Sequence, residues 1–147
     1  MLEFRILEYG SCDYHAMVDL RSEVLRKPLG LSFTEEQLQQ EMNDVLIGAF
    51  ITTAHTAIAG CCILTPVNEN IVQLRQMAVS PDMQGKGIGR DIVSFAEQYA
   101  HENGFNVLTL HARKVATGFY QKLGYETCGE EFIEVGIPHY EMRKNLK

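Results

Sequence analysis

Seven residues in the middle of the chain, Gln84-Gly85-Lys86-Gly87-Ile88-Gly89-Arg90, have the composition of an anion-binding turn. They follow an apolar run typical of a strand, 71–79, and precede an amphipathic run typical of a helix, 88–103. Three glycines at alternate positions remove Cβ atoms, so several backbone N–H groups can point at one anion at the start of the helix. The segment therefore predicts a cradle for a pyrophosphate group.

Two common nucleotide-binding motifs do not fit this turn. A nucleoside triphosphate loop requires Ser or Thr after its Gly-Lys pair, whereas Gly87 follows Lys86. The dinucleotide fingerprint G-x-G-x-x-G requires a third glycine where the chain has Ile92. The pattern that does fit is Gln/Arg-x-x-Gly-x-Gly/Ala, with Gln84, Gly87 and Gly89 at its fixed positions.

Length and charge narrow the class of protein that carries this turn. The chain has 147 residues, which suits one domain, and a formal net charge of −6, which argues against a nucleic-acid partner. Its N-terminus mixes charged and apolar residues, unlike a signal peptide, and no apolar run approaches membrane-spanning length. We therefore expect a cytoplasmic protein with no membrane partner.

The four cysteines, Cys12, Cys61, Cys62 and Cys128, have neither C-x-x-C spacing nor histidines at metal-ligand intervals. Cys61 and Cys62 are adjacent in an apolar strand-like run, so their side chains are expected on opposite faces. This pattern favours reduced, mostly buried thiols. It also predicts that the protein has no metal site and no covalent acyl-enzyme, because no cysteine has a Cys-His nucleophile setting.

The pattern of apolar residues predicts alternating strands and helices. A first strand at Phe4 and Ile6 precedes a helix capped by Asp13, and the capping-box sequence 34–37 opens a second helix. Short β-rich runs at 45–52, 56–65 and 71–79 predict an antiparallel meander.

After the glycine turn, the helix is expected to bury a stripe containing Ile88, Ile92, Phe95 and Tyr99 and to end at Gly104. The strand 106–111 is reached by this helical crossover and should pair in parallel with the strand before it. In the short helix that follows, Val115, Phe119 and Leu123 share one face, and Ala116 and Tyr120 share the neighbouring face. Closing strands at 125–128 and 139–142 are expected to be joined by a loop containing Gly129 and Glu130.

These motifs together resemble the GNAT superfamily of N-acetyltransferases, in which the pyrophosphate of acetyl-CoA sits on this turn. The resemblance is strongest from 73 to 123: the run 73–81 looks like the family's fourth strand, and Phe119-Tyr120-Gln121-Lys122-Leu123-Gly124-Tyr125 looks like its phenylalanine-tyrosine…glycine-phenylalanine signature. It implies one α+β domain over residues 1–147. The implied fold is a mixed, mostly antiparallel central sheet of about six to seven strands with helices on both faces.

The resemblance also implies acetyl-CoA as cosubstrate. The backbone of the fourth strand is expected to pair with the pantetheine amides as an added strand would. Lys86 and Arg90 add positive charge that offsets repulsion between the CoA anion and an acidic protein. The expected cofactor-binding residues are Met77, Ala78, Val79, Gln84, Gly85, Lys86, Gly87, Ile88, Gly89 and Arg90.

Acetyl transfer to an amine requires a neutral nucleophile and a protonated leaving group. A lysine-like amine titrates near ~10.4, so neutralising it at pH 7 costs about 4.6 kcal/mol. Tyr120 resembles the family's tyrosine that serves as general acid to the CoA sulfur. Where several members of the family carry a glutamate on the fourth strand, this chain has Gln73 and Gln76, which cannot accept a proton.

Glu134, His139 and His111 remain as candidates for the general base. Imidazole titrates near neutral pH, which suits the task. The run 134–139 resembles the C-terminal strand of one branch of the family. A chain of water molecules that relays the proton to bulk solvent is an equal alternative, and the sequence selects no single base.

The leading hypothesis is an N-acetyltransferase that moves an acetyl group from acetyl-CoA to a primary amine in a ternary complex. The alternative from another class is a non-catalytic acyl-CoA-binding sensor or interaction module. Transfer of a longer acyl chain, or transfer to a hydroxyl group, is a third reading. The acceptor is expected to be a small-molecule or peptide amine. Its site should be shaped by the connection 26–33 and by the strands near 134–139, and the acidic net charge favours a cationic amine. An exposed sheet edge would allow a homodimer.

Overall fold

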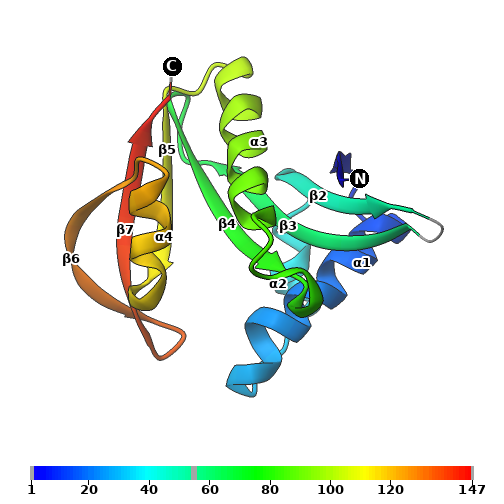
Figure 1. The fold of residues 1–147 in the computed structure, drawn as a ribbon. Coiled ribbons are helices and arrows are strands. Elements are labelled where there is room, and N and C mark those ends of the chain that lie inside the picture. The colour runs from blue at the N-terminus through cyan, green and yellow to red at the C-terminus, as the bar shows by residue number, and fades with distance from the viewer. Residues whose placement is uncertain (1, 54–55, 147) are drawn as a thin grey trace. The chain divides into compact units, whose positions relative to one another are not determined.

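The computed structural model describes residues 2–53 and 56–146 (Figure 1). Within these residues, seven strands form a sheet in the order β1-β2-β3-β4-β5-β7-β6. The pairs β1–β2, β2–β3, β5–β7 and β6–β7 are antiparallel, and β4–β5 is parallel, as the helical crossover predicts. The predicted fold class is confirmed. The strands are β1 Leu2–Leu7, β2 Val45–Thr52, β3 Thr56–Pro66, β4 Ile71–Val79, β5 Val107–Arg113, β6 Glu126–Glu134 and β7 Ile137–Asn145, and the α-helices are α1 Cys12–Arg21, α2 Glu35–Gln39, α3 Ile88–Glu102 and α4 Thr117–Lys122.

The chain divides into two compact units. The first runs to Leu64 and resumes over Gln76–Ala96, and the second comprises Thr65–Arg75 and everything from Glu97 onward. β4 and α3 each contribute residues to both units. The expectation of one domain over residues 1–147 therefore stays a prediction, and the two units are described in turn.

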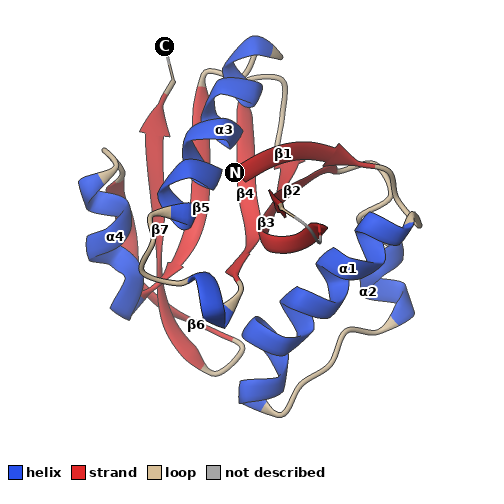
Figure 2. Cartoon of the chain, turned by 45° about the vertical axis from the view of Figure 1, so that its right-hand side comes forward, coloured by secondary structure: helices blue, strands red, loops and turns tan. Residues whose placement is uncertain are grey.

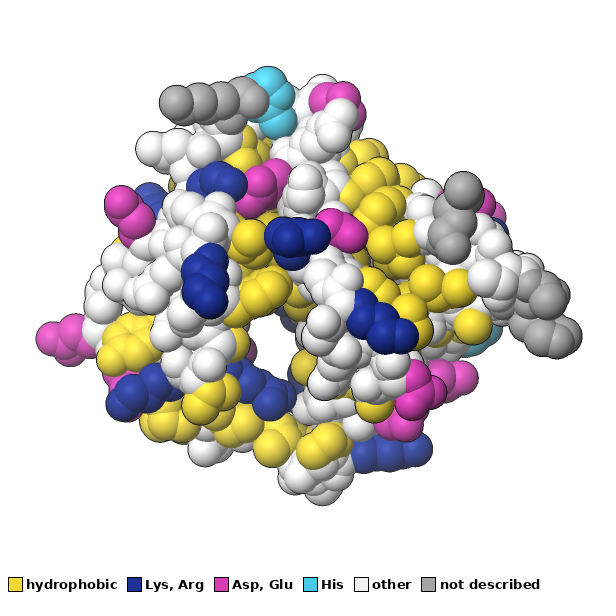
Figure 3. Space-filling view, in the orientation of Figure 1, with side chains coloured by type: hydrophobic (Ala, Val, Ile, Leu, Met, Phe, Trp, Pro, Cys, Tyr) yellow, Lys and Arg dark blue, Asp and Glu magenta, His cyan; other side chains and the backbone are white. Residues whose placement is uncertain are grey.

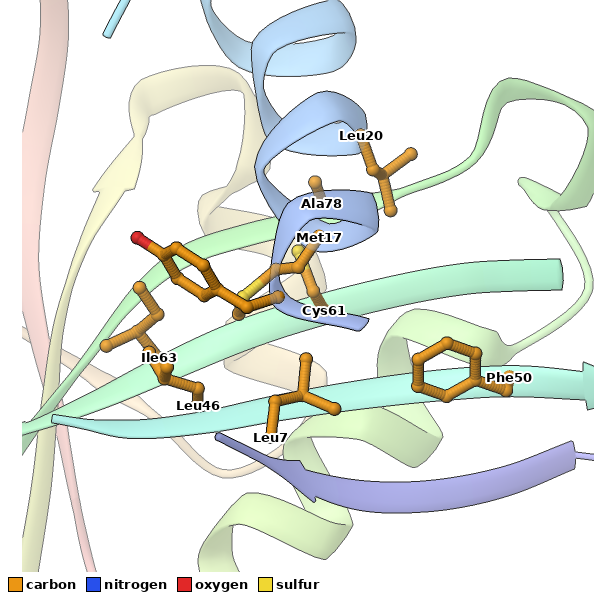
Figure 4. Packing of buried hydrophobic residues seen from close by; sticks show 9 residues of the cluster. Leu7, Met17, Leu20, Leu46, Phe50, Cys61, Ile63 and Ala78 are labelled. Carbon is orange, nitrogen blue, oxygen red and sulfur yellow. The ribbon is translucent and has the colours of Figure 1, made fainter. Parts of the chain in front are cut away.

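In the first unit, α1 packs against one face of β1, β2 and β3 (Figure 1). Its buried side chains Met17 and Leu20 meet apolar side chains from all three strands. Figure 4 shows these side chains converging between the helix and the sheet. The cluster comprises Leu7, Tyr14, Met17, Leu20, Leu46, Phe50, Cys61, Ile63 and Ala78.

The N-terminal part of α3 packs against the strands of the first unit through Gly60 of β3. A Cβ atom at Gly60 would lie 2.5 Å from the Ile92 side chain and 3.0 Å from the Ala78 carbonyl oxygen, so the close approach of helix and sheet requires glycine. The helix buries Ile88, Ile92, Val93, Ala96 and Ala100. Of the expected stripe, Ile88 and Ile92 are buried, whereas Phe95 and Tyr99 are half-buried and Phe95 stacks on Phe4 of β1.

Side-chain caps fix the starts of the two N-terminal helices. Ser11, rather than the predicted Asp13, caps α1, and its side chain accepts a hydrogen bond from the Tyr14 N–H. Asp13 lies in the first turn instead, where its negative charge interacts favourably with the positive end of the helix dipole. The predicted capping box of α2 is confirmed, with reciprocal bonds between Thr34 and Gln37.

In the second unit, α4 covers one face of the strands β5, β7 and β6 (Figure 2). Lys144 of β7 donates hydrogen bonds to the Leu123 carbonyl at the end of α4 and to Glu97 of α3. Since side chains alternate along a strand, the residues of β7 at even positions face the helices, and His139 and Glu141 face away. The register places His111 opposite Glu141 on that second face.

The β6–β7 hairpin differs from the prediction. Its turn lies at Val135 and Gly136, which both have positive φ, at 47° and 77°. Such a pair of left-handed residues forms the tight turn that suits the twist of two antiparallel strands. Gly129 lies inside β6, at an irregularity of register between Cys128 and Phe132, so the predicted loop at Gly129 and Glu130 is wrong.

Candidate functional site

The glycine turn in the first unit has the backbone geometry of an anion cradle. Gly85 and Gly87 both have φ of +82°, a left-handed conformation that strains any residue with a Cβ atom. The N–H of Asp91 donates to the Gly87 carbonyl at 3.1 Å, which makes Gly87 the N-cap residue that precedes α3. The N–H groups of Ile88, Gly89 and Arg90 precede the first intrahelical donor and therefore have no acceptor within the helix.

The third glycine has a different task from the other two. Gly89 lies inside α3, where its backbone is helical, so a positive φ is not the reason for glycine there. Without a side chain, its N–H can be approached closely by a bulky anion. The sequence pattern thus combines two glycines that shape the turn with one that leaves the helix start open.

Side chains around the turn supply charge and hold its geometry. Lys86 is exposed, and so is Arg90, whose Nε lies 3.7 Å from the Asp91 carboxylate. The side-chain amide of Gln84 donates to the Val79 carbonyl at 3.1 Å, which ties the turn to the end of β4. Gln84 is therefore placed to position the cradle. Its expected contact with the cofactor stays a prediction.

On the face drawn in Figure 3, basic and acidic side chains are interspersed among hydrophobic and neutral ones. The net charge of −6 is thus not gathered into one acidic field on this face. Where charges of both signs are mixed, the local electrostatic potential depends mainly on the nearest charges. Lys86 and Arg90 would therefore make the potential at the turn more positive for an approaching anion.

The backbone of β4 is irregular at Gln76. In the sequence, this residue is notable only because it stands where several members of the family carry a glutamate. Gln76 has φ of 54°, and a left-handed residue within a strand marks a bulge that bends the strand. The parallel pairing of β4 with β5 ends at Leu74 and Leu110, just before this residue. Beyond it, the Ser80 N–H donates to the Ala59 carbonyl of β3 at 2.8 Å. Met77, Ala78 and Val79 thus follow the last residue of β4 that is paired with β5.

Tyr120 lies in the second unit, on α4. Its side chain is 8% exposed and makes edge-to-face contacts with the rings of Phe119 and Tyr125. Tyr125, in turn, donates its hydroxyl hydrogen to Glu97 at 2.7 Å. Of the two helix faces described from the sequence, the one that contains Tyr120 packs inward, whereas Val115 on the other face is 93% exposed.

The three candidate bases meet on the face of the second unit's sheet that points away from α4. Nδ1 of His111 lies 2.9 Å from Glu134 Oε1, and Nε2 of His139 lies 3.8 Å from Glu134 Oε2. The ring of Phe132 packs on both imidazoles. His139 is buried, whereas the Glu134 side chain is 46% exposed. The structure therefore brings together residues from three strands that the sequence named separately.

The connection 26–33, expected to shape an acceptor pocket, holds an aromatic ring among cations. The guanidinium groups of Arg21 and Arg26 lie 4.5 and 4.7 Å from the centre of the Phe33 ring. Arg21 also makes a two-bond ion pair with Glu41 and is fully buried. The role of this connection in binding an acceptor stays a prediction.

Neither a metal site nor a membrane span is evident in the part of the chain that the structure describes. Within residues 2–53 and 56–146, no three or more His, Cys, Asp and Glu side chains are grouped so that they could hold a metal ion. Among the same residues, no helix combines the length and the hydropathy needed to cross a bilayer.

Comparison with known proteins gives the fold and the family. The sequence model of the acetyltransferase (GNAT) domain matches residues 19–146. YyaT, a protein of Bacillus subtilis (strain 168), is 29% identical over 142 residues that cover 91% of this chain and 90% of that protein. The crystal structure of a candidate N-acetyltransferase from Lactobacillus plantarum has a TM-score of 0.88 at 20% identity, and the match covers 99% of both chains.

A GNAT family acetyltransferase from Elizabethkingia anophelis, solved with acetyl-CoA bound, has a TM-score of 0.70 at 20% identity. That match covers 99% of this chain and 97% of the other. At such identities the two crystal structures show a shared fold, and the domain match shows the family. The chain belongs to the GNAT family of acetyltransferases.

Proposed function

We propose that this protein transfers an acetyl group from acetyl-CoA to a primary amine, without a covalent acyl-enzyme. The observation that carries the proposal is the glycine turn between β4 and α3, with its left-handed Gly85 and Gly87. Its N–H groups and the positive end of the helix dipole suit a pyrophosphate, and Lys86 and Arg90 add charge. The Elizabethkingia relative, which has the same fold, was solved with acetyl-CoA bound.

The strand before the turn fits the remainder of that cosubstrate. The bulge at Gln76 bends β4 after its last residue paired with β5, so Met77 to Val79 can offer backbone groups to the pantetheine amides. Val79 accepts a hydrogen bond from Gln84, which couples this strand end to the pyrophosphate cradle. A long cofactor would thus be held through main-chain groups rather than side chains.

Transfer further requires proton donation to the departing sulfur. Tyr120 is the donor we propose, because a phenol within an aromatic cluster is held in one orientation by its neighbours. A positioned general acid contributes roughly 10²–10⁴-fold to the rate. Cys61 and Cys62 do not suit nucleophilic catalysis, since burial raises the pKa of the Cys61 thiol to about 12 and that of Cys62 well above its ordinary value.

The test is release of the CoA thiol from acetyl-CoA in the presence of a panel of small amines, polyamines and amine-bearing peptides. We expect turnover with at least one amine. Tyr120→Phe should lower kcat by about 10²–10⁴-fold while the affinity for acetyl-CoA stays the same. Tyr125→Phe is the matched control, because it makes the same chemical change in the same aromatic cluster, and it should retain turnover.

The acyl-CoA sensor is the alternative outcome of this test. Tight binding of acetyl-CoA with no thiol release on any amine would favour the sensor over the enzyme. Equal losses in Tyr120→Phe and Tyr125→Phe would contradict the role of Tyr120, since a general disturbance of the cluster would then explain both.

A further inference from the structure

We propose that Glu134 and His139 form the proton-accepting pair of the reaction and that their acceptor is a cationic amine. This inference rests on the proposed function. In it, the half-exposed Glu134 carboxylate meets the ammonium group, and the buried imidazole of His139 stores the proton that the carboxylate removes. His111 and Phe132 are positioning residues that hold the two groups.

The tautomer of His139 follows from its hydrogen bond. Nδ1 lies 2.7 Å from the Ile137 carbonyl oxygen, and a carbonyl can only accept a hydrogen bond, so Nδ1 carries the hydrogen. In the neutral ring Nε2 then has a free lone pair, and this atom faces Glu134 Oε2 at 3.8 Å. The ring is thus oriented to receive a proton from the carboxylate.

Glu134 is held between two imidazoles. Its Oε1 accepts a hydrogen bond from Nδ1 of His111 at 2.9 Å, while Oε2 points at His139. The Phe132 ring lies edge-on to His111 and nearly parallel to His139, with centroids 5.1 and 5.9 Å away. The hydrogen bond from His111 holds one carboxylate oxygen and directs the other toward His139, and the side chain remains 46% exposed and can meet a ligand from solvent.

Charged groups of both signs surround His139. Glu134 faces it from β6, and Glu141 lies two residues along β7 on the same face. His111 and Arg113 come from β5, and Arg113 is the register partner of His139. Two carboxylates and one guanidinium group therefore share the face of the strands on which His139 lies.

Protons and electrons balance in this scheme. The ammonium gives one proton to Glu134, which passes it to His139 Nε2 and returns to the carboxylate. The freed lone pair of the amine forms the new C–N bond to the thioester carbon, and the C–S bond breaks. The nitrogen loses its second proton to water, Tyr120 donates a proton to the departing CoA sulfur, and the tyrosinate regains a proton from water. His139 then returns its proton to water through Glu134.

The first experiment needs no substrate. Nitrogen chemical shifts of the imidazoles, measured by NMR on the free protein at neutral pH, should show the Nδ1–H tautomer for His139. An Nε2–H tautomer would overturn the proposal, because no lone pair would then face Glu134. This result is independent of whether any amine is acetylated.

The second experiment is the pH dependence of kcat/KM with acetyl-CoA and a turned-over amine from the panel. Because the scheme requires a neutral imidazole, the wild-type rate should fall at acidic pH. His139→Gln should lose this acidic limb and about 10²–10⁴-fold of the rate. Glu134→Gln should raise KM for a cationic amine and lower kcat. Calorimetry should show unchanged acetyl-CoA binding in both variants.

Glu131→Gln is the matched control, because Glu131 lies on the same strand but is engaged by Lys114 and Tyr140. It should retain the rate and the pH profile. An acidic limb that persists in His139→Gln would overturn the proposal while leaving the acetyltransferase assignment intact. Absence of turnover with every amine in the wild type would instead overturn the proposed function and this catalytic role with it.

Discussion

Glu41 is the carboxylate of a buried ion pair on which the first unit depends. It accepts hydrogen bonds from Arg21 at 2.8 and 2.6 Å and from the Tyr14 hydroxyl at 3.0 Å. Glu41→Gln would leave the fully buried Arg21 without a counter-charge, and we expect it to lower the free energy of unfolding by about 3–5 kcal/mol. Urea denaturation followed by circular dichroism measures this loss.

The double variant Arg21→Met with Glu41→Leu removes both charges and should recover much of that stability, since an apolar pair can replace a buried ion pair. Glu131→Gln, which breaks the solvent-exposed pair with Lys114, should cost far less. If Glu41→Gln were no more destabilising than Glu131→Gln, the buried pair would not have the role assigned to it.

The thiols make a second prediction at the residue scale. Desolvation raises the pKa of Cys61 from 9.0 to about 12, whereas Cys12 is exposed. With a thiol reagent at pH 8, Cys12 should react rapidly in the native protein, and Cys61 and Cys62 only on unfolding. Labelling of the two buried thiols as fast as Cys12 would contradict the packing of β3.

The same pKa shift gives a pH dependence with a definite sign. A thiol whose pKa is higher in the folded state stabilises the fold fully below pH 9 and progressively loses this contribution between pH 9 and about 12. The free energy of unfolding should therefore fall above pH 9. Cys61→Ala should make the fall shallower, without abolishing it, because Cys62 is buried as well.

At the scale of elements, the left-handed residue in β4 gives a prediction about stability. Gln76 has a left-handed backbone, which a β-branched side chain tolerates poorly. Gln76→Ile should lower the free energy of unfolding by about 1–3 kcal/mol, whereas Gln76→Gly should change it by less than about 1 kcal/mol. Chemical denaturation of both variants measures this difference. Equal stability of the two would show that the strand is not bulged at this residue.

Many of the strands and helices could be predicted from the sequence. The runs 45–52 and 71–79 coincide with β2 and β4, because short, mainly apolar runs bounded by turn residues are typical of buried strands. The cap of α1 was misplaced because Ser11 and Asp13 are both good capping residues two positions apart. The β6–β7 turn was misplaced because Val135 gives no sign that it adopts a positive φ.

The candidate site was predictable to a similar degree. Left-handed Gly85 and Gly87 were found because glycine spacing reports backbone geometry directly. The contact of Glu134 with His111 was not predictable, because it depends on strand register and joins residues 23 apart in the chain. The bulge at Gln76 has no local signal either, since glutamine is not a residue type typical of left-handed backbone.

At the scale of the whole molecule, the proposed functions divide between the two units. The cradle and Gln76 belong to the first unit, whereas Tyr120 and the Glu134–His139 pair belong to the second. Binding measurements on cradle variants therefore test one unit, and rate measurements on acid and base variants test the other. A loss of rate with unchanged binding would assign an effect to the second unit alone.

The central claim is that acetyl-CoA binds through the glycine turn at the start of α3, and calorimetry with acetyl-CoA tests it most directly. Gly87→Ala strains a left-handed residue and brings a Cβ atom within 3.1 Å of the Arg90 guanidinium. Gly104→Ala imposes similar strain at φ +91°, after the other end of α3, and is the matched control. We predict one acetyl-CoA bound per chain, roughly tenfold or greater loss of affinity in Gly87→Ala, and wild-type affinity in Gly104→Ala. No heat with the wild-type protein, or equal losses in the two variants, would contradict the claim.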